Sequence, residues 1–438
     1  MPYTGHFAPY YWSANCVGAV DVMHLTVEGS TISNGAAGII VKNNEIAGSS
    51  YVTIKNNTVH NTGDDGITTD RANGTEVSGN YVYNLNAMLI PLKMQGTVTG
   101  TFTLGDVVTL NSSPPATGIF CEVLSGYFKI WQTSAEFFWS PANQQNAAHL
   151  RGDTITGPNG TFTNITYLDI EHTDCMTISH ESNVVVKGNK LFRNMAGDEQ
   201  FLFGGSQALK LDAPTNIEIS NNLIIAPCTA SPEAGVTLLM GGGTTNFNLF
   251  NNTMIGAMLV RNIAPPPLEI TNMYNNLISY LALDVDGGCN PRIINHGNNI
   301  FGSNPNGTGG PTYPFVVNGT ERVNYDINSL FVDTANDDFR LAPGSVAIDF
   351  GNPSYGPAID ILGNARVGAP DAGCYEYGAI SSTATGDINS DGSVDAIDLQ
   401  LLINMILSGS FDSKADLNSD SSVDAVDLQA LVNIILGA

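Results

Sequence analysis

The sequence predicts a mainly β fold in which short strands stack as successive coils of a solenoid. Glycine is frequent, with 46 among 438 residues, and only 13% of the residues are charged, which favours short strands and tight corners over amphipathic helices. Short β-branched runs alternate with Asn and Gly corners over 20–83 and again over 184–302, in phrases such as GIIVKNNEIAG and NIEISNNLIIAP. The second Asn of the later corners recurs after 33, 30, 24 and 23 residues, at Asn189, Asn222, Asn252, Asn276 and Asn299. A period in this range is typical of repeat architectures, in which a coil buries its apolar face only against its neighbours.

These coils resemble those of right-handed parallel β-helix proteins, a large group of secreted polypeptides. Asn suits the corners because it tolerates the left-handed backbone conformation and can hydrogen-bond its neighbours in a stacked ladder. The resemblance predicts N-terminal coils over residues 1–95 and C-terminal coils over residues 164–317. It is specific for the fold and implies little about function.

Residues 96–163, between the two sets of coils, depart from the corner pattern. Two related phrases, GTFTLGDVVT and HLRGDTITGPNGTFTN, lie on either side of an aromatic-rich segment in this region. We therefore expect a small inserted β domain that leaves one coil and rejoins the next. Its aromatic side chains form either the core of that domain or an exposed platform for a sugar ring or a neighbouring subunit. These residues are Phe128, Trp131, Phe137, Phe138 and Trp139.

The last part of the body, residues 318–378, contains the run DDFRLAPGSVAIDFGNPSYGPAIDILGNARVGAPDAGCYEYG. This run resembles the end-piece of many secreted β-helix proteins. The polar positions of that family are occupied here by Asp349, Asp360, Arg366 and Asp371. Ala372 stands where a bulkier apolar residue is usual in the family. We expect the end-piece to cap the solenoid, because the last coil otherwise exposes an unpaired edge and an apolar end.

After a polar linker at 379–386, the sequence repeats one phrase with a period of 29 residues: GDINSDGSVDAIDLQLLINMIL, then ADLNSDSSVDAVDLQALVNIIL. Both copies place oxygen-bearing residues at the spacing by which a twelve-residue loop surrounds a hard cation with six to eight oxygens. They are Asp387, Asn389, Asp391, Ser393, Asp395 and Asp398 in the first loop, and Asp416, Asn418, Asp420, Ser422, Asp424 and Asp427 in the second. Each loop leads into an apolar helix, predicted at 399–407 and 428–436. So small a unit has little core, and we expect metal binding to supply much of its folding free energy.

The repeated loops of residues 387–438 resemble a dockerin, the module that docks onto a cohesin of another protein. Asp in place of Glu at loop position 12 is a feature of dockerins, and the resemblance implies two bound calcium ions. In that family, partner contact runs through loop positions 10 and 11. These positions are apolar here, with Ala396 and Ile397 in the first copy and Ala425 and Val426 in the second. Ser421 stands where the first loop has Gly392 for its sharp turn, so the second site is expected to be strained or weaker.

The charge balance of the chain limits the classes of molecule that it can bind. The 16 Lys and Arg residues against 41 Asp and Glu residues give a formal net charge of −25, which repels nucleic acid and anionic membrane surfaces. It also disfavours polyuronate substrates unless calcium bridges the two. No apolar run reaches the ~18 residues that a membrane-spanning helix needs, so no membrane insertion is expected.

Six cysteines, spread from position 16 to position 374, lack the spacing of a zinc site. They are expected to be buried thiols or to form one or two disulfides. The first residues lack the basic and apolar regions of a secretion signal, although the rest looks extracellular. We therefore expect a processed or truncated N-terminus.

Several residues could carry catalysis, and each has a simpler interpretation. Asp64 and Asp65 in GDDGI resemble the paired carboxylates of β-helix polygalacturonases, but such a phrase is also an ordinary acidic corner, and the GHG and RIK motifs are absent. A lyase would need a Lys or Arg base. The available cations are Arg71, Lys93, Lys187, Lys190, Arg193 and Lys210, with carboxylates at Asp70, Asp198 and Glu199 nearby in the sequence. Adjacent opposite charges on a solenoid are more often surface ion pairs. A further set, His172, Asp174 and His180, forms either a dyad or metal site, or plain hydrogen bonds at a corner. The catalytic residues, if any, are left unassigned.

Two functions remain open from the sequence. The first is an extracellular or cell-surface assembly protein, a rod that docks through its calcium-dependent dockerin onto a cohesin-like partner or the next copy of itself, and so forms a filament. The second is a dockerin-bearing carbohydrate-active enzyme, a polysaccharide lyase or glycoside hydrolase of a cell-surface degradative complex. A glycan ligand is possible under both.

Overall fold

The computed structural model describes most of the chain, and the structural account concerns those residues alone. They are 15–35, 37–43, 51–63, 65–85, 91–113, 115–124, 127–132, 153–169, 174–195, 208–226, 236–240, 246–262, 269–284, 291–308, 314–378, 386–388, 394, 396–418 and 420–436.

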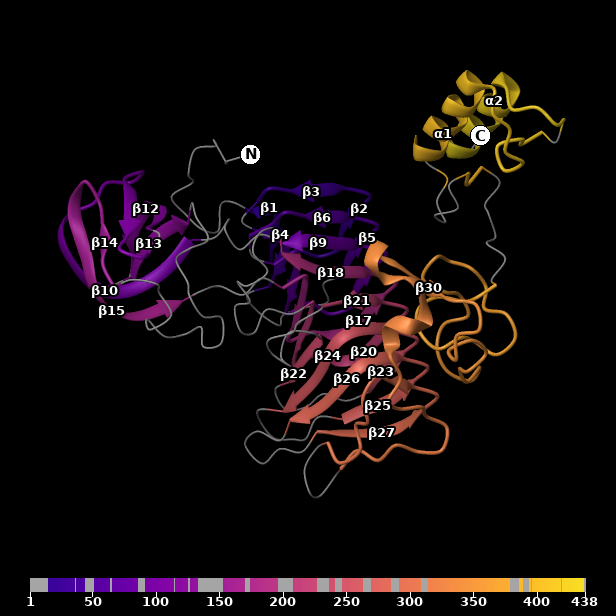
Figure 1. The fold of residues 1–438 in the computed structure, drawn as a ribbon, viewed down its shortest axis with the longest axis horizontal. Helices are drawn as coiled ribbons and strands as arrows, with labels where there is room; N and C mark the ends of the chain where they lie inside the picture. The colour runs from indigo at the N-terminus through magenta and orange to yellow at the C-terminus, as the bar shows by residue number, and fades with distance from the viewer. Residues whose placement is uncertain are drawn as a thin grey trace.

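The body is a solenoid of parallel strands with three faces, which confirms the predicted fold class (Figure 1). The first face is an eight-stranded sheet of β2 (Leu25–Glu28), β5 (Val52–Lys55), β8 (Thr75–Ser78), β17 (Ser182–Lys187), β20 (Thr215–Ser220), β23 (Phe247–Phe250), β25 (Glu269–Tyr274) and β27 (Arg292–Gly297). The other two faces are the arms of one larger sheet, which meet at β24 (Thr253–Asn262) and β26 (Leu277–Asp284).

Each arm takes one strand from most coils. The catalytic-candidate arm, named for the residues it carries, consists of β1 (Asn15–Val20), β4 (Ala37–Lys42), β7 (Ile67–Asp70), β16 (Met176–Ser179), β19 (Leu209–Asp212) and β22 (Val236–Met240). The flank arm consists of β3 (Thr31–Ser33), β6 (Thr58–His60), β9 (Tyr81–Leu85), β18 (Lys190–Met195), β21 (Leu223–Ile225) and, past the junction, β28 (Ile300–Phe301).

The core follows from alternation along each strand. In β5, Val52 and Ile54 point inward and are fully buried, whereas Thr53 and Lys55 lie on the outside and are partly exposed. The same pattern repeats in successive coils, so the inward side chains join into one continuous apolar cluster from Ile32 to Phe315. Stacking supplies the burial that a single coil lacks.

A buried asparagine ladder fixes the corners between the eight-stranded sheet and the flank arm. Its members are Asn57, Asn80, Asn189, Asn222, Asn252, Asn276 and Asn299, none more than 1% exposed. From Asn80 onward, each side-chain oxygen accepts the backbone N–H and the side-chain amide of the preceding member, at 2.9–3.0 Å. The residue before each member is Asn or Gly with φ between 51° and 65°, a conformation that suits these two residues best. The ladder predicted from the sequence is therefore present.

The inserted domain is a closed antiparallel barrel. Its strands follow the order β10 (Pro91–Thr101), β13 (Tyr127–Gln132), β12 (Ala116–Leu124), β11 (Val107–Leu110), β14 (Ile155–Thr156) and β15 (Asn159–Asp169). Phe128 stacks on Phe162 with ring centroids 4.3 Å apart, and both rings are 1% exposed, so Phe128 belongs to the core of the barrel. The side chain of Trp131 and all of Phe137, Phe138 and Trp139 lie outside the described residues. The barrel strands extend beyond the predicted limits of 96–163 at both ends.

The end-piece differs from the predicted cap. Phe315, just before the end-piece, joins the solenoid core, and only the beginning of the end-piece closes the last coil, where Arg322 pairs with Ile300. The chain then turns back through η6 (Ile327–Leu330), β29 (Phe331–Asp333), η7 (Thr334–Asn336) and β30 (Asp338–Leu341), and lies along the flank arm (Figure 1). The reason is that the flank arm carries outward apolar side chains that need cover. They are Phe192, Leu223, Ile225, Leu277 and Ile300.

Polar contacts hold the end-piece to the corners. The amides of four corner residues donate to its carbonyls: Asn221, Asn251, Asn275 and Asn298. Within it, the Asp371 carboxylate accepts the Asp349 N–H at 2.7 Å, and the Asp360 carboxylate accepts the Asn364 N–H at 2.8 Å. Arg366 donates to Glu376 and to the Asn221 side chain, each at 2.9 Å. The residues that the resemblance singled out therefore shape the end-piece or attach it to the solenoid.

The C-terminal domain consists of two loop–helix units. Helix α1 (Ala396–Ser408) and helix α2 (Ala425–Leu436) each begin three residues before the predicted start. Leu402 and Leu431, which are 29 residues apart, are fully buried and form the centre of a small core with Ile388 and Ala415. Of the predicted linker, only Gly386 lies among the described residues.

Candidate functional site

The second loop of the C-terminal domain is arranged around two carboxylates. Asp427, in the first turn of α2, is fully buried and accepts the backbone N–H groups of Leu417 at 2.8 Å and Asp424 at 2.9 Å. Asp416, at the start of the loop, accepts the N–H groups of Asp420 at 3.0 Å and Ser421 at 2.9 Å. The carboxylates at loop positions 1 and 12 thus hold the backbone of the loop from both of its ends.

The turn between these carboxylates passes through Ser421. Its φ is 71°, in the left-handed region where a side chain is strained and where the first copy has Gly392. Next to it, the Asp420 carboxylate accepts the Ser422 N–H at 2.9 Å and the Ser422 hydroxyl at 2.6 Å. Hydrogen bonds from Ser422 and then Asn418 lower the pKa of Asp420, so this side chain presents a charged oxygen donor.

The first loop repeats the arrangement as far as it is described. Asp398 is fully buried and accepts the Ile388 N–H at 2.8 Å, the same contact that Asp427 makes with Leu417. Asp387 is 1% exposed. The other predicted ligands of this loop lie outside the described residues: Asn389, Asp391, Ser393 and Asp395.

The predicted partner residues lie in the first turns of the two helices, one pair on each helix. Ile397 is 56% exposed and Val426 is 57% exposed, and both follow an exposed alanine, Ala396 or Ala425. Contact with water does not favour these exposed apolar side chains, which occupy equivalent positions of the two repeats.

A polar cluster also lies on the catalytic-candidate arm. Asp65 and Asp174 precede equivalent strands of neighbouring coils, and the Asp174 N–H donates to the Asp65 carboxylate at 3.2 Å. The ammonium group of Lys210, on the next strand, lies 3.9 Å from the Asp174 carboxylate. The hydroxyls of Thr68 and Thr177 donate to Asp65 and Asp174. Burial raises the pKa of Asp65, against these hydrogen bonds and the charge of Lys210.

The sequence did not indicate that Asp65, Asp174 and Lys210 meet, because the barrel separates the first two by 109 positions. The signal was present in the matching phrases DGITT and DCMTI, where each Asp precedes its strand by two residues and a Thr follows at the same offset. The partner predicted for Asp65, Asp64, lies outside the described residues.

The remaining catalytic candidates are dispersed. Asp70 contacts His180, 3.3 Å from its Nδ1, and Arg71 at 3.9 Å. Lys187 pairs with Glu76 at 3.0 Å on the eight-stranded sheet, which is a surface ion pair. Lys93 lies in barrel strand β10, and Lys190 lies on the flank arm. The other candidates fall outside the described residues or have side chains that do: His172, Arg193, Asp198 and Glu199.

Comparisons with known proteins agree with this architecture. Residues 385–436 match the dockerin type I domain, and residues 10–111 match the right-handed β-helix region. The chain thus combines a parallel β-helix body, whose first part matches the right-handed β-helix model, with a C-terminal segment that matches a type I dockerin. A dockerin of this type binds calcium and docks its chain onto a cohesin domain in an extracellular complex.

Among solved structures, the crystal structure of jun a 1, the major allergen from cedar pollen, matches with 10% sequence identity over 76% of this chain and 79% of that chain. Its TM-score of 0.18 is too low to support any argument about function. No curated protein matches the chain. Among the described residues, no helix is long and apolar enough to cross a membrane.

Proposed function

We propose that this protein is a secreted assembly component, a β-helix rod that docks through its calcium-loaded dockerin onto a cohesin-like partner or onto the next copy of itself. The observation that carries the proposal is the repeated apolar pair at the start of α1 and α2, with Ile397 and Val426 exposed to the same degree. Such a surface, on a domain attached by a short linker, serves contact with another protein.

The two loops would hold one calcium ion each. Every side chain at their predicted ligand positions offers oxygen, the donor that calcium prefers. Among the described residues, no three acidic, His or Cys side chains already converge as metal ligands. We therefore expect calcium to draw the carboxylates of Asp416, Asp420 and Asp427 together and to stiffen the domain, which thermal melting with calcium and then with excess chelator would show.

Docking onto the next copy would produce a filament if the rotation between copies does not close. Light scattering of the full chain, with calcium and then with chelator, tests this. Large assemblies that dissolve on chelation, and that fail to form in the Ile397→Asp/Val426→Asp variant, are the expected result. The matched control is Val332→Asp, which changes an exposed apolar residue on the end-piece.

A chain that stays monomeric with calcium present would rule out self-docking and would leave a foreign cohesin as the partner. Pull-down with cohesin domains would then show whether the chain docks onto a cohesin. If the double variant still binds as the unchanged chain does, the docking surface lies elsewhere.

A second function, glycan cleavage, is favoured by the cluster of Asp65, Asp174 and Lys210. Two neighbouring acidic residues joined by a backbone hydrogen bond, one with a raised pKa, and a cation beside the other are groups that can divide acid and base roles. A screen of plant, algal and bacterial glycans, with Asp174→Asn and the surface control Glu76→Gln, tests it. Cleavage that Asp174→Asn abolishes and Glu76→Gln leaves intact would establish an enzyme, and a screen without any cleavage would count against one.

A further inference from the structure

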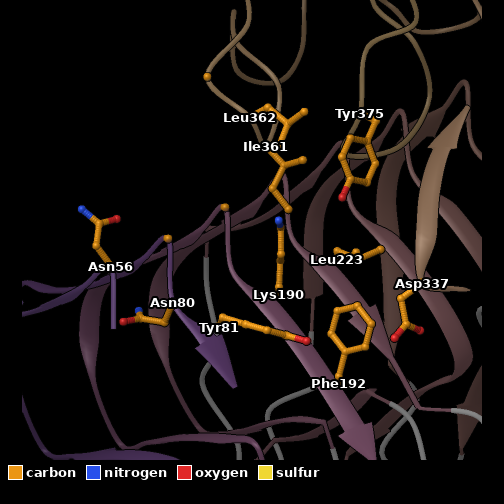
Figure 2. Close-up of a pocket in the computed structure, with 13 residues that line it drawn as sticks. Asn56, Asn80, Tyr81, Lys190, Phe192, Leu223, Asp337, Ile361, Leu362 and Tyr375 are labelled. Atoms are coloured by element: carbon orange, nitrogen blue, oxygen red, sulfur yellow. The ribbon is translucent and has the colours of Figure 1, made fainter. Parts of the chain in front are cut away.

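A cavity of about 460 Å³ lies where the end-piece leaves the flank arm (Figure 2). Its floor is formed by the starts of β9, β18 and β21, and its walls come from Asp337, Tyr375 and the turn at Ile361 and Leu362. The volume is within the range of sites that bind small molecules or short polymer segments. None of these residues belongs to the dockerin or to the cluster around Asp65.

The floor of the cavity is aromatic. The Tyr81 ring stacks on Tyr83 with centroids 4.5 Å apart and meets the edge of Phe192 at 5.5 Å. Tyr83 in turn stacks on His60 at 5.0 Å. Phe192 is covered by the end-piece, whereas Tyr81, Tyr83 and His60 remain partly exposed. A row of partly exposed rings thus continues out of the cavity along β9 and β6.

Three polar groups without partners line this cavity. In the part of the chain that the structure describes, the Lys190 ammonium, the Asp337 carboxylate and the Asn56 amide form no hydrogen bond or ion pair. Figure 2 shows Lys190 extending upward beside Tyr81 toward Ile361, with Asp337 on the other side of Phe192. Burial, and to a smaller extent Asp337, raises the pKa of Tyr81, so its phenol stays a hydrogen-bond donor.

The corner residues explain why the cavity opens at this level. At later coils the corner is Asn221 or Asn251, and its amide binds a carbonyl of the end-piece. At the cavity the equivalent residues are Gly79 and Gly188, with φ of 63° and 65°, and neither contributes a side chain to the space, which Asn56 of the preceding corner lines instead. The sequence therefore leaves the site free at the two coils where the aromatic row begins.

We propose that this cavity binds a neutral saccharide, with one sugar ring stacked on Tyr81 and its hydroxyls bonded to Lys190, Asp337 and Asn56. Donor and acceptor groups side by side suit hydroxyls, which both donate and accept. A phosphate or a uronate would meet the charge of Asp337 and the overall charge of −25. A purely apolar ligand would leave the charged groups of the wall desolvated and unpaired.

Calorimetry and affinity electrophoresis of the full chain, in calcium, against soluble glucan, mannan, xylan and galactan test the proposal, with polygalacturonate and alginate as anionic competitors. We expect at least one neutral glycan to bind and neither polyuronate to bind. Tyr81→Ala should weaken binding by about tenfold or more, because it removes the stacking surface. Tyr81→Phe keeps the ring and should weaken binding much less.

Tyr51→Ala is the matched control, because Tyr51 is also an exposed tyrosine stacked on a histidine, His24, but lies outside the cavity. Lys190→Met keeps the side-chain stem and should also weaken binding. Equal loss in Tyr51→Ala and Tyr81→Ala would overturn the site, and so would binding of polyuronates alone or of no glycan. Because the dockerin is unchanged in all these variants, docking measured beside them separates this proposal from the proposed assembly function.

Discussion

Glu181 lies inside the solenoid at the corner between β16 and β17, and its environment is unusual for a carboxyl group. The side chain is 2% exposed, and neither its oxygens nor the hydroxyls of Thr69 and Thr75 have a hydrogen-bond partner within normal length. Burial raises the pKa of Glu181 to about 7, the hydroxyls of Thr75 and Thr69 oppose the shift, and the charge of Asp70 adds to it. A polar group in this position makes the stability of the coil depend on pH.

The sign of this dependence follows from proton binding. The folded chain holds the proton of Glu181 up to about pH 7, whereas an ordinary Glu releases it near 4.5. The stabilisation is therefore complete below about pH 4.5 and is lost as the pH rises through 7. Glu181→Gln should remove this dependence and raise the free energy of unfolding at pH 8 by about 3 kcal/mol.

Urea unfolding of the full chain between pH 5 and pH 8 measures the effect of Glu181→Gln. The control is Glu28→Gln, which changes a half-exposed Glu of β2 and should leave the pH dependence as it is. A variant that loses stability at pH 8 would mean that the ionised carboxylate has partners, such as water, that compensate its burial.

At the residue scale, contacts that recur in successive coils could be predicted from the sequence, whereas contacts that occur only once could not. The ladder from Asn189 to Asn299 could be recognised in the sequence because these coils each place one Asn in the same corner contact. The pairing of Asp65 with Asp174 was not visible, since it depends on knowing that the barrel returns the chain to the same arm. Lys190 was considered only as a catalytic base, because the sequence does not show which outward residues the end-piece leaves uncovered.

At the element scale, the second loop of the dockerin has Ser421 where the sequence of the first loop has Gly392. Ser421 has a φ of 71°, a conformation that costs a non-glycine residue about 1–2 kcal/mol. Ser421→Gly should relieve this strain, raise the stability of the dockerin by about 1 kcal/mol and tighten calcium binding at the second loop.

Calcium titration followed by circular dichroism and thermal melting measures the effect of Ser421→Gly. Ser410→Gly, which changes an exposed serine between the two units, is the control and should not raise calcium affinity. If Ser421→Gly weakens binding instead, the serine side chain itself supports the loop.

The two helices of the dockerin could be predicted because a 29-residue repeat gives each position twice. The helices begin three residues earlier than the apolar pattern suggested, since Asp398 and Asp427 belong to the first helical turn while tying the loop. In the insert, the sequence indicated β structure and left open whether its aromatic residues form a core or an exposed platform. Closure of its strands into a barrel depends on pairing between β10 and β15, distant segments that no local pattern relates.

At the scale of the whole molecule, Arg366 joins the end-piece to the solenoid. Its side chain is 5% exposed, pairs with Glu376 at 2.9 Å, and donates to Asn221 across the contact. Arg366→Met should destabilise the protein by about 3–5 kcal/mol, because it leaves the buried Glu376 charge without its partner. Adding Glu376→Gln should recover part of the loss.

Thermal unfolding together with limited proteolysis of the end-piece tests this. Arg340→Met is the control, because Arg340 forms an exposed pair with Asp338, and such pairs are worth at most about 1 kcal/mol. If Arg366→Met and Arg340→Met behave alike, the apolar contacts hold the end-piece without the ion pair.

The placement of the end-piece was the main error of the sequence prediction at this scale. Its polar residues could be recognised, but a terminal segment after a solenoid suggests a cap. The outward apolar residues that attract it, such as Leu223 and Leu277, alternate with inward ones in the sequence and cannot be assigned to a side without the register of the coils.

The barrel occupies a single connection of one coil. Strand β9 ends at Leu85 and β16 begins at Met176, yet β16 pairs with β7 of the preceding coil in unbroken register. The coils on either side of this connection thus pair with each other whatever its length, because each strand finds its partner in the neighbouring coil. An ancestral chain could have gained, lost or exchanged the whole barrel here without disturbing the rest, and a laboratory graft of another small domain between Leu85 and Met176 would use the same freedom.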